Sequence, residues 1–153
     1  MRPSFAPGSM LTFMWDMNLR IMSVERDDLD TERMTALNDV AIFQGIDVHV
    51  LDFADYASLE EAMATPEGTL LVAAMNQSSR KVLIWLLNCD ALAPLSVVFT
   101  YALRETLTAR VDNCVQTIFV AQRTSLKRLF EHPDSAFYRS HYKLILRDMP
   151  KSL

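Results

Sequence analysis

The sequence predicts an α/β fold, with one layered domain whose mostly parallel sheet of four or five strands is covered by flanking helices. Short apolar runs alternate along the chain with segments of helical period, which is typical of such folds. In the run KVLIWLL, residues 81–87, every residue after Lys81 is apolar, so both faces of a strand would be apolar. A central strand covered on both faces requires that pattern. The length of 153 residues suits one domain.

Composition narrows the classes of function. The net charge is −4 and the basic residues are scattered, so we expect neither a nucleic-acid partner nor an anionic membrane partner. No run of eighteen apolar residues occurs, so we expect no membrane span. Cys89 and Cys114 have no metal-ligand spacing and make no disulfide framework. Free thiols indicate a reducing compartment, and we expect a cytoplasmic protein.

The first residues predict a tail. Pro3, Pro7 and Gly8 interrupt residues 1–16, which we expect to be disordered, with the α/β domain occupying residues 17–148. Phe13, Met14 and Trp15 would form an apolar cluster within that tail. Such a cluster needs a surface to pack on, so we expect it to support a homodimer.

The next segments predict a strand, a helix and a second strand. Residues 19–24 (LRIMSV) suit a strand. Asp30 or Thr31 could cap a helix with Met34 and Leu37 on one face, ending near Gly45. The end of that segment could instead form a hairpin that turns near residues 44–45. Residues 48–53 are a strand in either case.

Two helix-start signals follow. Ser58 precedes a pair of glutamates, and Thr65 precedes a proline in the position that opens helices. Residues 69–75 (TLLVAAM) then fit either a helix or a buried strand, because periodicity does not separate these for so short an apolar run.

The second half reads more regularly. Residues 81–87 form a strand and residues 88–94 a loop. The next segment has apolar residues at four-residue spacing, which predicts one long amphipathic helix: Leu95, Phe99, Leu103, Leu107 and Val111. Residues 115–121 form the next strand, Thr124 or Ser125 caps a helix that Pro133 ends, and residues 142–146 suit a last strand.

From about Val48 onward the chain resembles STAS domains, the fold of anti-sigma factor antagonists. The resemblance rests on the succession VHVLDF, KVLIWLL, long helix, QTIFVAQ, and most locally on TSLKRLFE, residues 124–131. It covers roughly two thirds of the chain. It implies a regulatory module that acts by protein–protein contact, with a regulated hydroxyl in the loop before the long helix.

The corresponding loop reads DALAPLS and contains one hydroxyl, Ser96, without the preceding Asp and following Gly of the family pattern D-S-S-G-L. The resemblance implies that Ser96 is phosphorylated, which would add nearly two negative charges to the partner surface. Alternatively, Ser96 only caps its helix. The implied partner surface comprises Asn88, Asp90, Ser96, Thr100, Arg104 and Glu105.

The chain is also similar to receiver domains of response regulators. In that alternative, residues 69–75 and 95–102 are the third and fourth strands, and Thr100 ends the fourth. Ala73, Ala74 and Gln122 then occupy the positions of the acceptor Asp and the Lys, so only a binding or dimerisation module would remain.

Enzyme motifs are missing from the sequence. It contains no G-x-S-x-G and no Walker loop, and its three glycines lie too far apart for the dinucleotide pattern G-x-G-x-x-G. His49, His132 and His141 lie in no recognisable catalytic or ligand spacing. We therefore expect a non-catalytic module with no cofactor and no metal.

Overall fold

In the computed structural model, five strands form one sheet in the order β2-β3-β4-β1-β5. Every pairing is parallel, which confirms the α/β class. The structure describes residues 6–57, 59–77, 79–92, 98–109, 112–135, 137–138, 141–144 and 146. The strands are β1 (Ile21–Glu25), β2 (Asp47–Asp52), β3 (Val82–Leu87), β4 (Val115–Ala121) and β5 (Tyr142–Lys143).

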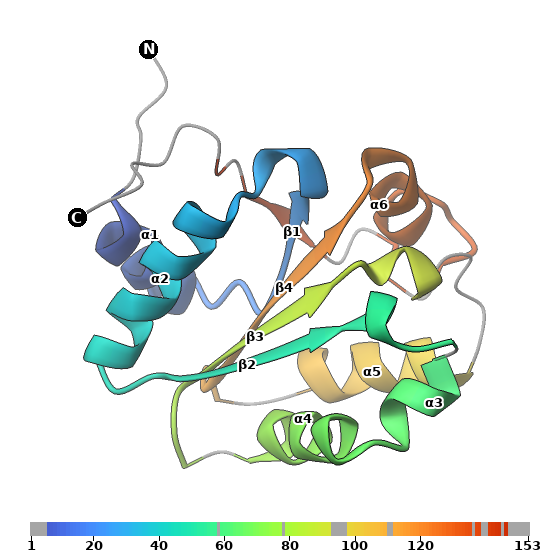
Figure 1. The fold of residues 1–153 in the computed structure, drawn as a ribbon, viewed down its shortest axis with the longest axis horizontal. Helices are drawn as coiled ribbons and strands as arrows, with labels where there is room; N and C mark the ends of the chain where they lie inside the picture. The colour runs from blue at the N-terminus through green and yellow to red at the C-terminus, as the bar shows by residue number, and fades with distance from the viewer. Residues whose placement is uncertain are drawn as a thin grey trace.

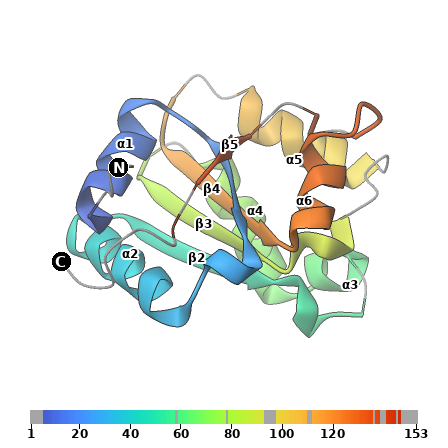
Figure 2. The ribbon, with the colours of Figure 1, turned by 90° about the horizontal axis from the view of Figure 1, so that it is seen from above.

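Helices cover both faces of the sheet (Figures 1 and 2). On one face lie α1 (Pro7–Asp16) and α2 (Thr31–Phe43); this is the α1–α2 face. On the other lie α3 (Leu59–Met63), α4 (Pro66–Asn76), α5 (Val98–Thr108) and α6 (Arg123–Phe130); this is the α3–α6 face. Three short 3-10 turns follow strands directly: η1 (Arg26–Asp28), η2 (Phe53–Asp55) and η3 (Cys89–Leu92).

The two-faced core explains the continuous apolar runs. In β3, Ile84 points into the cluster of the α3–α6 face and Trp85 into the cluster of the α1–α2 face, and both are fully buried. In β4, Phe119 points into the cluster of the α3–α6 face and Ile118 into that of the α1–α2 face. A parallel strand between two helical layers has no solvent side, so most of its residues are apolar. The polar residues Ser23 in β1 and Gln116 and Thr117 in β4 are buried as well.

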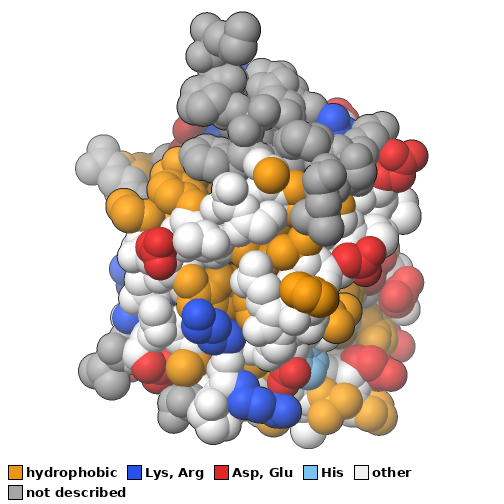
Figure 3. All heavy atoms as spheres, turned by 90° about the vertical axis from the view of Figure 1, so that its left-hand side faces the viewer, with side chains coloured by type: hydrophobic (Ala, Val, Ile, Leu, Met, Phe, Trp, Pro, Cys, Tyr) orange, Lys and Arg blue, Asp and Glu red, His pale blue; other side chains and the backbone are white. Residues whose placement is uncertain are grey.

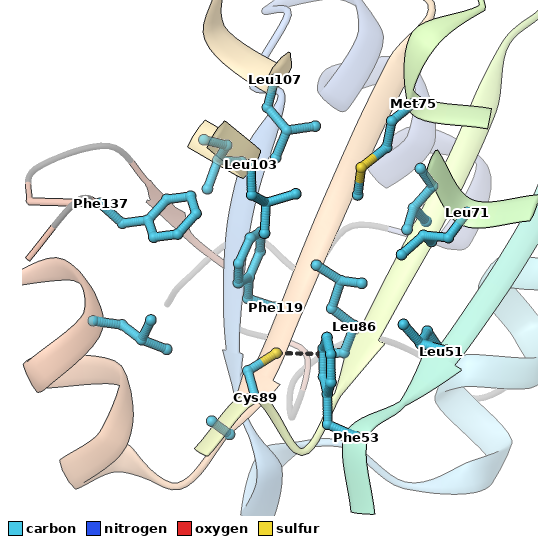
Figure 4. Close-up of a cluster of buried hydrophobic side chains, with 14 of the residues drawn as sticks. Leu51, Phe53, Leu71, Met75, Leu86, Cys89, Leu103, Leu107, Phe119 and Phe137 are labelled. Atoms are coloured by element: carbon cyan, nitrogen blue, oxygen red, sulfur yellow. Dashed lines mark hydrogen bonds between the residues drawn. The ribbon is translucent and has the colours of Figure 1, made fainter. Parts of the chain in front are cut away.

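Side chains from α4 and α5 converge on the central strands (Figure 4). Leu71 and Met75 reach down from α4, and Leu103 and Leu107 from α5. Further along the same face, Phe119 meets two rings, those of Phe130 and Phe137, edge-on at 5.6 and 5.3 Å between centroids. Such edge-to-face pairs add about 0.5–1.5 kcal/mol each beyond area burial.

The predicted tail over residues 1–16 is wrong for residues 7–16, which form α1. Pro7 opens the helix at a position where its missing N–H costs nothing. Met10, Leu11, Met14 and Trp15 then fall on one face and are buried against the sheet. The apolar cluster therefore packs on its own chain, and a homodimer stays a prediction without that support.

Two predicted helix N-caps, Asp30 and Thr65, are confirmed. The Asp30 carboxylate accepts a hydrogen bond from the Arg33 N–H at 2.8 Å and caps α2. The Thr65 hydroxyl accepts from the Gly68 N–H at 3.1 Å and caps α4. The alternative hairpin near residues 44–45 is wrong, because α2 runs to Phe43 and Gly45 takes the positive φ of a helix end.

Residues 69–75 lie in α4 and residues 98–102 in α5. The strands that the receiver alternative assigns to these segments are therefore wrong. Receiver domains also use the strand order 2-1-3-4-5 rather than the order found here. The helical state of these segments is what the STAS succession requires, but the STAS resemblance itself stays a prediction.

The start of α6 differs from the predicted one. The helix begins at Arg123 after Gln122, which makes no side-chain cap, so neither Thr124 nor Ser125 is the N-cap. The predicted last strand is confirmed only for Tyr142 and Lys143, which pair with β1. Among the described residues, no helix combines the length and the apolar character needed to cross a membrane.

The buried face of α1 gives a direct test of the first correction. We expect Met14→Ala to lower the free energy of unfolding by about 2–5 kcal/mol, because it leaves a cavity in the core. Met17→Ala, at the exposed end of the same segment, should change it by less than about 0.5 kcal/mol. Urea unfolding measures both. Equal, negligible effects would show that residues 7–16 do not pack on the domain.

Candidate functional site

The chain leaves neighbouring strands β1 and β4 toward opposite faces of the sheet. After β1 it enters α2 on the α1–α2 face, and after β4 it enters α6 on the α3–α6 face. Open parallel sheets bind ligands beside the carboxyl ends of their strands at such a switch point. The carboxyl edge between β1 and β4 is thus the first place to look for a site.

Arg26 occupies this edge. It is the first residue after β1, in the turn η1. Its guanidinium Nη1 donates to Oδ1 of Asn88, and Nη2 lies 3.0 Å from Oδ2 of Asp90. Asn88 and Asp90 directly follow β3. One cation from the β1 end therefore bridges two side chains from the β3 end, across β4.

Asn88 extends this network to the edge strand. Its Nδ2 donates to Oδ1 of Asp52 at 2.7 Å, at the end of β2. The same Asp52 oxygen accepts from the Ala54 N–H at 2.9 Å. Asn88 takes a left-handed φ of 55°, a conformation that Asn tolerates better than most residues. The backbone turn at this position aims the amide between Arg26 and Asp52.

Asp90 extends the network to β4 and α6. Its Oδ1 accepts from the Gln122 N–H at 3.1 Å, and its carboxylate also accepts from the Ser125 hydroxyl. Burial raises the pKa of Asp90, but the Ser125 hydroxyl, the Gln122 N–H and the Arg26 charge outweigh it. The net pKa therefore lies below the usual value, and Asp90 is ionised at neutral pH.

The N-terminus of α2 is capped by the protein's own Asp30 side chain. The Asp30 carboxylate accepts from the Arg33 N–H, and Arg33 Nη1 lies 2.5 Å from Asp30 Oδ2. A carboxylate thus takes the place at a helix N-terminus where an anion would otherwise bind. The preceding turn adds Asp27 and Asp28, so this end of the sheet is acidic.

The predicted partner residues separate into three groups. Asn88 and Asp90 come together, but inside the intramolecular network. Arg104 and Glu105 lie exposed on α5, away from that network. Ser96 and the side chain of Thr100 lie outside the described residues, so the phosphorylation of Ser96 stays a prediction.

Arg26 and Asp52 were missed by sequence reasoning. A signal for them existed, because polar residues directly following parallel strands meet at one edge of the sheet. Beneath the network, Cys89 is fully buried and its thiol donates to the Leu86 carbonyl at 2.7 Å. Burial raises the pKa of this thiol, so it stays protonated and unreactive.

A second feature lies on the α3–α6 face, where an apolar hollow of about 150 Å³ opens between α4 and α5. Five of its lining residues come from α3 and α4: Met63, Leu71, Val72, Met75 and Asn76. The others are Phe53, Leu86, Leu103 and Thr106. Figure 4 shows Leu71, Met75 and Leu103 converging above Leu86.

Metal ligands do not gather in the described parts of the chain, where no cluster of three or more His, Cys, Asp or Glu side chains could hold an ion. Both cysteines are free thiols.

No protein-family model and no curated protein matches the chain. Among solved structures, the fold is similar to a Walker-type ATPase of Pyrococcus abyssi, with a TM-score of 0.54 and 8% sequence identity. The match covers 95% of this chain and 56% of the ATPase, so the chain spans little more than half of that protein. The likeness establishes a shared arrangement of helices and strands.

The charge on Asp90 predicts a pH dependence of stability. Because the folded pKa lies below the unfolded one, the stabilisation is present above about pH 4 and is lost as the pH falls through the folded pKa. We expect Asp90→Asn to cost about 1–3 kcal/mol at pH 7, from the loss of charge-assisted hydrogen bonds. The difference from the unchanged protein should shrink as the pH falls below about 4 and through the folded pKa of Asp90.

Urea unfolding at several pH values measures this effect. Asp134→Asn, at a highly exposed carboxylate, is the control and should have little effect at any of them. A pH-independent loss in Asp90→Asn would contradict a charged role for Asp90.

Proposed function

We propose that the protein is a non-catalytic protein–protein interaction module that docks its partner on the surface of α3, α4 and α5. The observation that carries this proposal is the apolar hollow between α4 and α5, together with the exposed lining residue Val72. The proposal keeps the regulatory role expected from the sequence and locates its contact surface.

The size of the hollow favours a protein partner. Pockets for small molecules typically measure about 300–1,000 Å³. A hollow of about 150 Å³ is too small for most cofactors but accommodates one large apolar side chain. Interfaces concentrate their binding energy where such an anchor enters a desolvated pocket.

The surroundings of the hollow indicate the chemistry of the partner. On α4, the lining residue Val72 is 41% exposed. The helices α3, α4 and α5 carry four acidic residues, Glu60, Glu61, Glu67 and Glu105, against one basic residue, Arg104. A partner segment with an apolar anchor flanked by Lys or Arg would complement this surface.

The opposite side offers a weaker alternative. Figure 3 shows the side that carries α1 and α2, where hydrophobic side chains reach the surface among polar and charged ones. Ile42 and Phe43 are exposed at the end of α2. Scattered apolar side chains of this kind are normal on soluble proteins, whereas an apolar hollow is a specific anchor site.

Part of the surface expected from the STAS resemblance lies on α5, the helix that contributes Leu103 and Thr106 to the hollow. Arg104 and Glu105 follow Leu103, a lining residue, directly along α5. Ser96 precedes the first residue of α5 by two positions in the sequence. In our proposal a phosphate on Ser96 would add negative charge near an acidic docking surface and modulate a basic partner.

Likeness to a Walker-type ATPase raises the question of nucleotide binding. A Walker phosphate site needs a glycine-rich loop after β1 whose free N–H groups and lysine hold the phosphates. Here the segment after β1 reads RDDLD, without glycine or lysine. Its Asp30 caps α2, and Arg26 is paired with Asn88 and Asp90. We propose that this site is not retained.

Peptide selection tests the docking proposal. A random peptide library displayed on phage and selected on the full chain should yield peptides with an apolar anchor next to Lys or Arg. We expect Val72→Asp to weaken their binding about tenfold or more, because a carboxylate at the rim desolvates poorly. The control Ile42→Asp, at a helix position 62% exposed on the other side, should leave binding unchanged.

Equal binding to both variants would contradict the docking surface. Nucleotide binding is measured separately with ATP and Mg²⁺ by calorimetry. We expect no saturable binding up to about 1 mM, and a dissociation constant below that value would contradict a non-catalytic module.

A further inference from the structure

A polar hollow lies between α6 and the paired strands β1 and β5, on the α3–α6 face. Its volume is about 260 Å³, and it is lined by Ser23, Glu25, Arg123, Leu126, Lys127, Glu131, His141 and Lys143. This hollow is distinct from the apolar one between α4 and α5. The interaction module proposed above makes no use of it.

Three rows of same-face residues build this hollow. Ser23 and Glu25 are two positions apart in β1, so their side chains point to the same face of the sheet. Lys143 lies beside Ser23 in the β1–β5 register. Arg123 and Lys127 are one turn apart on α6, and Glu131 continues their row after the helix. The secondary structure thus aims these polar groups at one space.

The charges within the hollow do not balance. Lys143 Nζ lies 3.2 Å and Arg123 Nε 3.6 Å from the same oxygen, Oε1 of Glu25. Two cations therefore share one carboxylate, and Lys127 and Glu131 add one charge of each sign. Three cations against two carboxylates leave one net positive charge, inside a chain whose overall charge is −4.

Buried polar groups mark the hollow as more than a gap in packing. Ser23 is almost fully buried, and the Glu25 side chain is only 19% exposed. Nδ1 of His141 is buried and has no hydrogen-bond partner among the described residues. Burying an unpaired polar group costs free energy, so such a group calls for an explanation, and a bound ligand is one.

The His141 ring lies against Phe130, with centroids 4.2 Å apart. Burial lowers the pKa of His141; Glu131 raises it and Lys143 lowers it further, so the net pKa lies below the usual value. The ring is therefore neutral at pH 7 and offers one donor and one acceptor. Cations, a hydroxyl and a neutral imidazole together suit oxygen-rich anions.

We propose that this hollow binds a small organic anion through a phosphate or carboxylate group, held by Arg123, Lys127 and Lys143. The volume of about 260 Å³ lies just below the usual range for small-molecule pockets and limits the ligand to a small one. Arg123 offers a planar fork to the anion, and the two lysines act as point charges.

Titrations followed by ¹H–¹⁵N NMR spectra of the full chain test the proposal. The probes are sodium phosphate and sodium succinate, each at pH 7 and at an ionic strength held constant with sodium chloride. We expect saturable shifts of amides in residues 23–25, 123–131 and 141–143, with a dissociation constant near or below about 1 mM. Saturation with phosphate alone, or with succinate alone, identifies the group that the site prefers.

Variants separate this site from general charge effects. Arg123→Gln should weaken binding about tenfold, the size expected when one charge-assisted contact is lost. Arg80→Gln is the matched control. The Arg80 side chain is 69% exposed and pairs with Asp47, and the Arg123 side chain is 68% exposed and pairs with Glu25. Its binding should match that of the unchanged protein. Lys127→Gln, at an exposed position of α6, is a second variant that spares the Glu25 pairs.

Three results would overturn the proposal. The first is no saturable shift with either probe up to about 10 mM. The second is unchanged affinity in both Arg123→Gln and Lys127→Gln when their spectra show folded protein. The third is an equal loss of affinity in Arg80→Gln, which would show non-specific attraction.

Discussion

The position of β1 between β4 and β5 determines where the other elements lie. β1 is the first strand along the chain, but it is hydrogen-bonded on both sides to strands from the second half of the chain. To reach β2 at the far edge, the chain must cross β4 and β3, and it does so through α2 on the α1–α2 face. The return through α4 and α5 runs on the opposite face. Right-handed crossovers require this division.

That division creates the switch point at the carboxyl edge, and the sequence there gives it a structural use. In a Walker-type site the corresponding place holds phosphates on free backbone N–H groups. Here Arg26, Asn88, Asp52 and Asp90 join the ends of β1, β2 and β3 and the start of α6. The groups that could bind a ligand bind each other, so the functional surfaces that we propose lie elsewhere, in the two hollows of the α3–α6 face.

Local chemistry explains what could be predicted from the sequence. The strand β3 is a continuous apolar run and β4 is apolar apart from Gln116 and Thr117. The caps at Asp30 and Thr65 depend only on residues within one turn. The helix α1 had a signal too, in the spacing of Met10, Leu11, Met14 and Trp15, but the opening proline was read as a sign of disorder rather than as a helix start. Each of these features depends on residues that are close together in the sequence.

Long-range packing explains what could not be predicted. Nothing near β1 in the sequence specifies that it pairs with β4 and β5, because parallel pairing depends on contacts between distant segments. The same holds for Arg26, whose partners follow β3, and for both hollows, which exist only where helices from different segments meet the sheet. Single polar residues at strand ends carry little information until the strand order is known.

A double-mutant cycle of Arg26→Gln and Asp90→Asn tests most directly whether the carboxyl edge is held by its own side chains. Urea unfolding of the unchanged protein, both single variants and the double variant gives the coupling free energy between the two residues. This account predicts a coupling of about 1 kcal/mol or more, because each variant leaves the other residue's charge without its partner. A coupling within about 0.3 kcal/mol of zero would mean that the two side chains act independently, and the edge would then be open to a ligand.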